Sequence, residues 1–253
     1  MAICDAHAHP GEHEEQESRI RQGVRTFLCA TDPQSAETVA AMCGGSELLI
    51  PTYGLHPWYA DQFEVEQMLP YIDKGVLLGE IGMDSVWCEV LRPRQLAVFK
   101  EQLALAENRN IPVILHTKGE EKAILTCIEG FRPPILVHWY SAERYLEGYV
   151  EKDCFFSIGP DVQHNPAVQA VVKAVRPERL LVETDGMGAV RWAAQEYGQK
   201  DVSGEDGDAA AVLRRSMEYI AMVKGIDFAA LERQLEENFM YLAKYRERDK
   251  LRR

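Results

Sequence analysis

The chain has 253 residues, 46% of them hydrophobic and 27% charged, and its formal net charge is −12. This is the composition of a globular protein that can bury a substantial core, and the sequence shows no low-complexity linker and no apolar run of about 18 residues that would span a membrane. We also expect no secretory leader. The negative charge disfavours a protein that coats long nucleic acid with lysine and arginine, but it does not exclude catalysis at a phosphate, because a site loaded with metal cations is locally positive.

The cysteines bear on the cellular compartment. Six of them are spread along the chain without a CxxC pair, which is typical of reduced thiols and does not suit a disulfide framework or a structural zinc site. We expect all six to be packing residues: Cys4, Cys29, Cys43, Cys88, Cys127 and Cys154. We also expect one domain over residues 1–253, a cytoplasmic location, no membrane association and no obligate protein partner.

Short apolar or β-branched runs recur along the chain and predict eight strands. The runs lie near residues 2–7, 24–30, 48–54, 75–82, 112–116, 134–138, 154–159 and 179–185. Helical spacing between them is clearest over residues 95–108, and a second apolar stripe over 228–242 indicates core packing. Alternating strands and helices predict an α/β fold, a (β/α)₈ TIM barrel, whose catalytic groups would stand at the C-terminal strand ends.

Titratable residues stand at the ends of several predicted strands. His7 and His9 end the first strand two residues apart, so both imidazoles should point to one face. Four more follow later apolar runs: Glu80, His116, His138 and Asp185. Such residues suit Zn²⁺, Mn²⁺, Fe²⁺ or Co²⁺, and a bridging carboxylate also accepts Mg²⁺. Six ligands are too many for one tetrahedral ion and fit two, which could flank a phosphate.

These motifs form an ordered set. HxH near the N-terminus, "GLHPW", "GEIGMD", "PVILHTK", an "LVH" strand end and "ETD" together resemble the TatD family of metal-dependent deoxyribonucleases, over residues 3–239. The resemblance implies an amidohydrolase-like barrel and metal-dependent hydrolysis of phosphodiester bonds in DNA. It implies two divalent ions (Zn²⁺, Mn²⁺ or Mg²⁺), one held by His7, His9 and Asp185, the other by His116 and His138, with Glu80 as the bridge.

Within that scheme Asp185 and Glu80 are the predicted catalytic residues. Asp185 would orient and deprotonate the attacking water, and Glu80 would set the metal separation. His56 in "GLHPW" and Lys118, where the family usually carries arginine, are the candidates for holding the phosphate of DNA or of a small phosphodiester. A structural histidine before proline is the alternative for His56.

The chain departs from the family pattern at two places. "ETD" is followed by Gly186-Met187-Gly188 instead of a small residue and proline, and Trp139 stands beside His138 where a small residue is usual. A second hypothesis is therefore a hydrolase of a small phosphodiester, ester or amide that uses the same metals. A third is a binding or scaffold protein that has lost turnover.

Residues 186–208 contain five glycines and should follow the eighth strand. They are either a mobile lid that carries Arg191 and Trp192 toward the substrate or a solvated insertion. The two remaining histidines, His13 and His164, are expected at the surface or behind the site.

Overall fold

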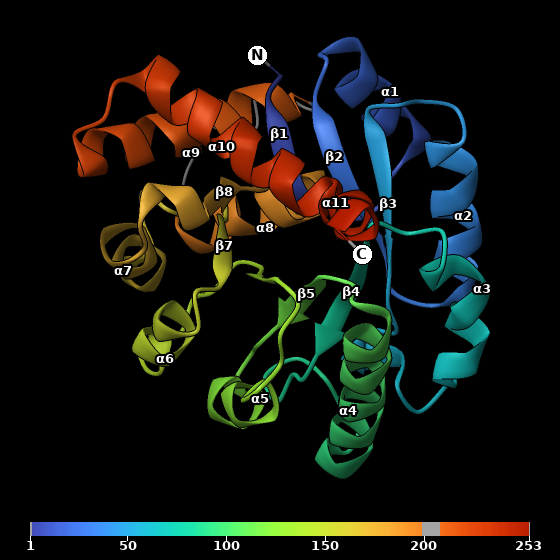
Figure 1. The fold of residues 1–253 in the computed structure, drawn as a ribbon. Coiled ribbons are helices and arrows are strands. Elements are labelled where there is room, and N and C mark those ends of the chain that lie inside the picture. The colour runs from blue at the N-terminus through green and yellow to red at the C-terminus, as the bar shows by residue number, and fades with distance from the viewer. Residues whose placement is uncertain (1, 199–207, 253) are drawn as a thin grey trace.

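The computed structural model describes residues 2–198 and 208–252. Within them, eight parallel strands form one sheet in the order β1 to β8 (Figure 1). The strands are β1 (Cys4–Ala8), β2 (Arg25–Ala30), β3 (Leu49–Tyr53), β4 (Leu77–Gly82), β5 (Val113–His116), β6 (Ile135–Val137), β7 (Phe155–Ile158) and β8 (Leu180–Val182). The edge strands meet where the Asp185 amide donates to the His7 carbonyl (3.0 Å), so the sheet forms a nearly closed barrel. This confirms the predicted fold.

Helices alternate with the strands and surround the barrel (Figure 1). They are α1 (His13–Arg21), α2 (Pro33–Cys43), α3 (Leu69–Ile72), α4 (Arg92–Arg109), α5 (Glu121–Cys127), α6 (Leu146–Glu151), α7 (Pro166–Ala174), α8 (Met187–Glu196), α9 (Ala209–Lys224), α10 (Phe228–Ala243) and α11 (Tyr245–Arg252). Short 3₁₀ turns occur at Pro57–Tyr59, Val65–Met68 and Pro177–Arg179. No described helix is long and apolar enough to cross a membrane.

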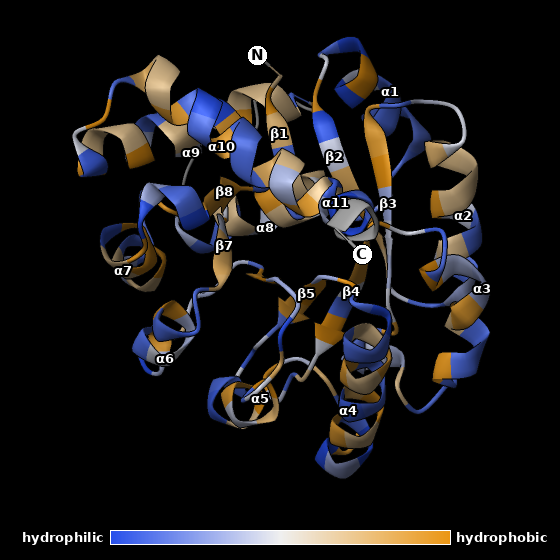
Figure 2. Cartoon of the chain, viewed as in Figure 1, coloured by the Kyte–Doolittle hydropathy of each residue, from blue (hydrophilic) through white to orange (hydrophobic). Residues whose placement is uncertain are grey.

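Two layers of apolar side chains hold the barrel together. The larger layer lies between the strands and the outer helices, where α4 buries Phe99 and Leu103, and Figure 2 shows α4 and α10 with mixed hydrophobic and hydrophilic faces. A smaller cluster fills the barrel interior, and Phe239 of α10 stacks on Phe27 there with ring centroids 3.9 Å apart. The predicted stripe over 228–242 is thus core packing, and α10 covers the end of the barrel where the strands begin.

A glycine and a helix cap show how the sequence sets local geometry. Gly82 ends β4 beside His116 of β5, and a Cβ atom at this position would lie 1.9 Å from the His116 carbonyl oxygen. Only glycine therefore allows these two strands to approach at the end that carries Glu80 and His116.

At the start of α2, the Asp32 side chain accepts hydrogen bonds from the Gln34 and Ser35 amides, which satisfies two free N–H groups of the helix.

A buried ion pair ties β1 to β8. Arg19 of α1 is fully buried, and its guanidinium donates to Asp5 of β1, to Glu15 (3.1 Å) and to the Thr184 hydroxyl (2.8 Å). Asp5 also accepts from the Thr184 amide (3.0 Å) and hydroxyl (2.7 Å). Because Thr184 directly precedes Asp185, this network fixes the strand end from which Asp185 projects.

The structure corrects the reading of residues 186–208 as a glycine-rich loop. Residues 187–196 form helix α8, which buries Met187, Val190, Ala193 and Ala194. The apolar residues recur every three or four positions, and the two glycines fall before or within the first turn, where they do not prevent the helix. Residues 199–207 lie outside the described residues.

Candidate metal centre

Glu80 lies at the centre of the predicted ligand set, with 1% of its surface exposed. Its Oε2 lies 3.3 Å from His7 Nε2 and 3.4 Å from His9 Nε2. Its Oε1 lies 2.7 Å from both His116 Nδ1 and His138 Nε2. The two oxygens of one carboxylate therefore face two different pairs of imidazoles, which come from strand ends far apart in the sequence.

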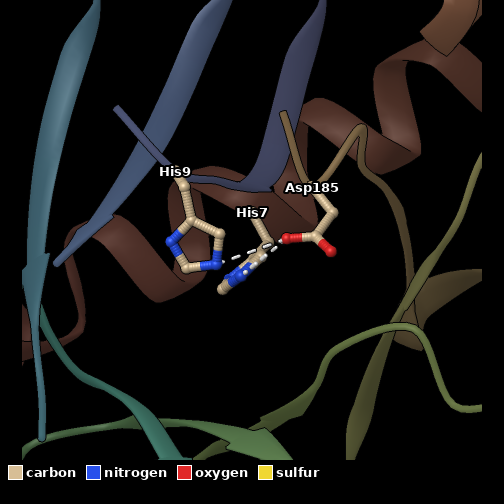
Figure 3. Close-up of side chains that lie close together, drawn as sticks. All are labelled: His7, His9 and Asp185. Atoms are coloured by element: carbon tan, nitrogen blue, oxygen red, sulfur yellow. Dashed lines mark ion pairs between the residues drawn. The ribbon is translucent and has the colours of Figure 1, made fainter. Parts of the chain in front are cut away.

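Asp185 completes the first of these groups. Figure 3 shows His7 and His9 directed at the same carboxylate oxygen, and Asp185 Oδ1 lies 3.4 Å from each Nε2. His7 Nε2 and Asp185 Oδ1 are buried and make no hydrogen bond to the described residues. Unpaired buried polar atoms are costly, so their convergence with His9 within 4.8 Å fits a cation held by two nitrogens and an oxygen.

The imidazoles of His7 and His9, at the end of β1, are oriented from behind by a single residue, Cys29 of β2. Its Sγ lies 3.1 Å from His7 Nδ1 and accepts a hydrogen bond from the Thr52 hydroxyl (2.7 Å), and its carbonyl oxygen lies 3.2 Å from His9 Nδ1. These partners leave both Nε2 atoms free to face the site, which is how proteins orient histidine ligands. The expectation that all six cysteines serve only in packing is therefore wrong for Cys29.

Two carboxylates do the same for the other pair. Asp84 Oδ2 lies 3.0 Å from His116 Nε2, and Glu183 Oε1 lies 3.3 Å from His138 Nδ1. Each carboxylate can accept a hydrogen bond from the outer nitrogen of its ring, which leaves the other nitrogen directed toward Glu80. The sequence analysis missed both residues, although Glu183 stands only two positions before Asp185.

The charges of the cluster stabilise one another. Burial alone would raise the pKa of Glu80, but nearby histidines, with His138 and His7 first, outweigh it and hold the pKa well below its ordinary value. Burial would lower the pKa of His138, but Glu80 and Glu183 outweigh it and raise this pKa to about 10. The pKa values of His7 and His116 are also raised, because the nearby Glu80 and, for His7, Cys29 outweigh burial. Without a cation, the raised pKa values of His7, His116 and His138 favour protonated rings beside the Glu80 carboxylate.

His56 and Lys118, the predicted phosphate contacts, lie beside this cluster. His56 Nε2 is 3.7 Å from Glu80 Oε2, and its Nδ1 accepts a hydrogen bond from the Trp58 amide (3.2 Å). Burial lowers the pKa of His56 to about 3, so the ring is neutral and carries its proton on Nε2. Lys118 Nζ donates to the Ser141 hydroxyl (2.6 Å), and burial lowers its pKa although Asp161 and Asp185 oppose the shift.

A cavity of about 1150 Å³ opens over the cluster. His9, Glu80, His116, His138 and Asp185 lie at its wall together with His56 and Lys118. Trp192 of α8 also lines it, whereas its neighbour Arg191 is not one of the lining residues. His13 and His164 lie on the surface, as expected.

Comparison with known proteins places the chain in a family. The model of the family described as "TatD related DNase" matches residues 4–244. The chain belongs to this family. It is a metal-dependent hydrolase of the TatD type, built on a TIM barrel.

Individual relatives agree with this assignment. The TatD family chain is 24% identical over 228 residues to a putative deoxyribonuclease, tatdn3, of Danio rerio, which covers 81% of each chain. It is 27% identical over 184 residues to the 3'-5' ssDNA/RNA exonuclease TatD of Pantoea ananatis, covering 66% of this chain and 70% of that protein. The crystal structure of the TatD homologue YjjV from Escherichia coli superposes with a TM-score of 0.76 at 23% identity, over 95% of this chain and 97% of that one.

Proposed function

We propose that this TatD family chain hydrolyses phosphodiester bonds of DNA with two divalent metal ions. The observation that carries the proposal is that the two carboxylate oxygens of Glu80 face different imidazole pairs. Oε2 faces His7 and His9, and Oε1 faces His116 and His138. A carboxylate between two imidazole pairs suits a bridge between two cations. Zn²⁺, Mn²⁺ and Mg²⁺ are the candidate ions, because the donors are imidazole nitrogens and carboxylate oxygens.

We assign one ion to His7, His9 and Asp185 and the other to His116 and His138. When bound, such ions lower the pKa of a water molecule and offset the charge that develops on phosphate oxygens. The protein supplies the orientation: Cys29, Asp84 and Glu183 fix the four rings from behind, so the nitrogens that face the site need no rearrangement.

Asp185 is the proposed proton acceptor. Its neighbouring histidines outweigh burial and lower its pKa, so the carboxylate is ionised at neutral pH. Its side chain is 19% exposed and it lines the cavity, where it can accept a hydrogen bond from water and then the proton. We assign the substrate phosphate to the Nε2–H of neutral His56 and to the Lys118 ammonium, one a neutral donor and the other a point charge.

The nuclease proposal is tested with protein that has been treated with a chelator and then supplied with Mn²⁺, Zn²⁺ or Mg²⁺. The substrates are a single-stranded oligodeoxynucleotide, its duplex form and a neutral nitrophenyl ester. We expect metal-dependent cleavage of the oligonucleotide, with Glu80→Gln as the inactive control. Hydrolysis of the ester alone would instead show that the metal site acts on acyl substrates.

Lys118→Ala tests the assigned phosphate contact. A charge-assisted hydrogen bond contributes about 1.5–3 kcal/mol, so we expect kcat/KM for the oligonucleotide to fall roughly 10- to 100-fold. Any ester hydrolysis should change far less, because a neutral ester presents no anionic oxygen. Lys122→Ala, an exposed lysine on α5, is the matched control and should retain wild-type activity. Equal losses on both substrates would mean that Lys118 supports the structure of the site.

A further inference from the structure

All four tryptophans of the chain line the cavity above the metal centre: Trp58, Trp87, Trp139 and Trp192. Three of them form a cluster. The Trp192 ring lies 5.8 Å from the Trp87 ring and 6.0 Å from the Trp139 ring, measured between centroids, and both pairs meet edge to face. The rings come from the loops after β4 and β6 and from helix α8, so the barrel alone brings them together.

The members of the cluster differ in how firmly they are held. Trp139 is 5% exposed, and its indole N–H donates to Asp161 (2.8 Å), so this ring is a fixed part of the wall. Trp87 is 50% exposed and Trp192 is 43% exposed. Large aromatic surfaces are costly to leave in water, and two of them on the wall of an active-site cavity indicate a ligand with an apolar face.

A positive charge lies against the same rings. Lys118 Nζ is 5.0 Å from the Trp87 centroid and 5.9 Å from the Trp139 centroid. Lys118 follows His116 by two residues, and it lines the same cavity as the tryptophans and the proposed metal ligands. A ligand that spans this region would place an anion at Lys118 and a flat ring at the tryptophans.

We propose that Trp87 and Trp192 form a stacking subsite for the nucleobase next to the scissile phosphate, with Trp139 as its fixed support. This inference rests on the proposed nuclease function. A nucleotide joins an anionic phosphate to a flat aromatic base, which matches the adjacent ammonium and indole rings. A base can stack on protein only when it is free of its duplex partner, so the subsite favours single strands. The cavity volume of about 1150 Å³ exceeds the ordinary range of small-molecule sites, about 300–1,000 Å³.

Binding is measured with a phosphorothioate oligothymidylate, which resists cleavage, on metal-loaded protein by fluorescence anisotropy. A second probe of the same length carries an abasic residue at the terminal nucleotide. Stacking on an aromatic residue corresponds to an affinity change of about 5- to 150-fold per base. We expect Trp192→Ala to weaken binding of the intact probe within this range and Trp192→Phe to restore most of it. On the abasic probe the alanine variant should bind as the wild type does.

One control and a second variant of the subsite separate the possible outcomes. Met222→Ala removes an exposed apolar side chain (69% exposed) from α9, outside the cavity, and should bind both probes as the wild type does. Trp87→Ala repeats the test on a loop residue if the α8 variant does not fold. Equal losses on both probes, or no loss on either, would overturn the stacking subsite. Failure of wild type to cleave an unmodified oligonucleotide would overturn the nuclease function, whereas base-dependent binding would still support the subsite.

Discussion

Arg19→Met tests whether the buried ion pair at the seam between β1 and β8 holds the site together. Removing the guanidinium leaves the Asp5 carboxylate, which is fully buried, without its cation. Breaking a buried pair in this way destabilises a protein by about 3–5 kcal/mol. For a chain of this size each kcal/mol shifts Tm by about 2–4 °C, so we expect a fall of roughly 6–20 °C.

Thermal and urea unfolding are followed by circular dichroism in a chelating buffer, so that metal binding does not contribute to the measured stability. Arg21→Met, at an exposed arginine of the same helix, should be within about 0.5 kcal/mol of wild type. The double variant Asp5→Asn/Arg19→Met should recover part of the loss, because the amide can still accept from the Thr184 amide and carries no buried charge. An Arg19→Met protein as stable as wild type, or a double variant less stable than the single one, would refute the reasoning.

Two further predictions concern the metal centre. Glu80→Gln should retain the fold but bind fewer metal ions per chain than wild type, because an amide presents only one oxygen and no charge to the two imidazole pairs. Elemental analysis measures the metal content, and a content equal to that of wild type would argue against a bridge. Glu17→Gln, on the surface, is the control. Metal affinity should rise with pH, because the pKa values of His7, His116 and His138 are raised and bound cations must displace their protons. Below the pKa of a ligand, each pH unit of increase makes Kd about tenfold smaller for every proton that the metal displaces. Calorimetric titration with Mn²⁺ between pH 6 and 8 measures this dependence. A constant Kd over that range would contradict protonated histidines in the cluster.

The fold was predictable because each strand carries its own signal. Runs such as residues 112–116 and 154–159 are short, apolar and β-branched or aromatic. Eight such runs separated by segments with helical spacing are the pattern that predicts a barrel. Helix α8 was missed because its glycines suggested a loop. Yet Met187, Val190 and Ala194 recur at helical spacing. Gly186 lies just before the helix with φ +84°, a backbone conformation that glycine adopts more readily than other residues.

The candidate site could be predicted from the sequence only where a proposed ligand follows an apolar run. A titratable residue directly after an apolar run can be recognised without any partner, as at Glu80 or His138. The residues that orient the ligands have no such signal. Cys29 lies within an apolar run, as a buried packing cysteine would, and only the pairing of β2 with β1 brings it to His7. Asp84 lies in a loop four residues after Glu80, and only the path of that loop brings it to His116.

The two departures from the family pattern lie on the same wall of the cavity. Trp139 and the stretch from Gly186 look unrelated in the sequence, one as extra bulk beside a ligand and the other as an altered loop. In the structure the loop after β6 and helix α8 meet, and Trp139 packs edge to face against Trp192. A barrel gathers all loops that follow its strands at one end, so changes at two distant positions alter one wall of the cavity while every proposed ligand stays in place. We therefore expect this chain to differ from its relatives in which substrate it holds more than in how it holds metal.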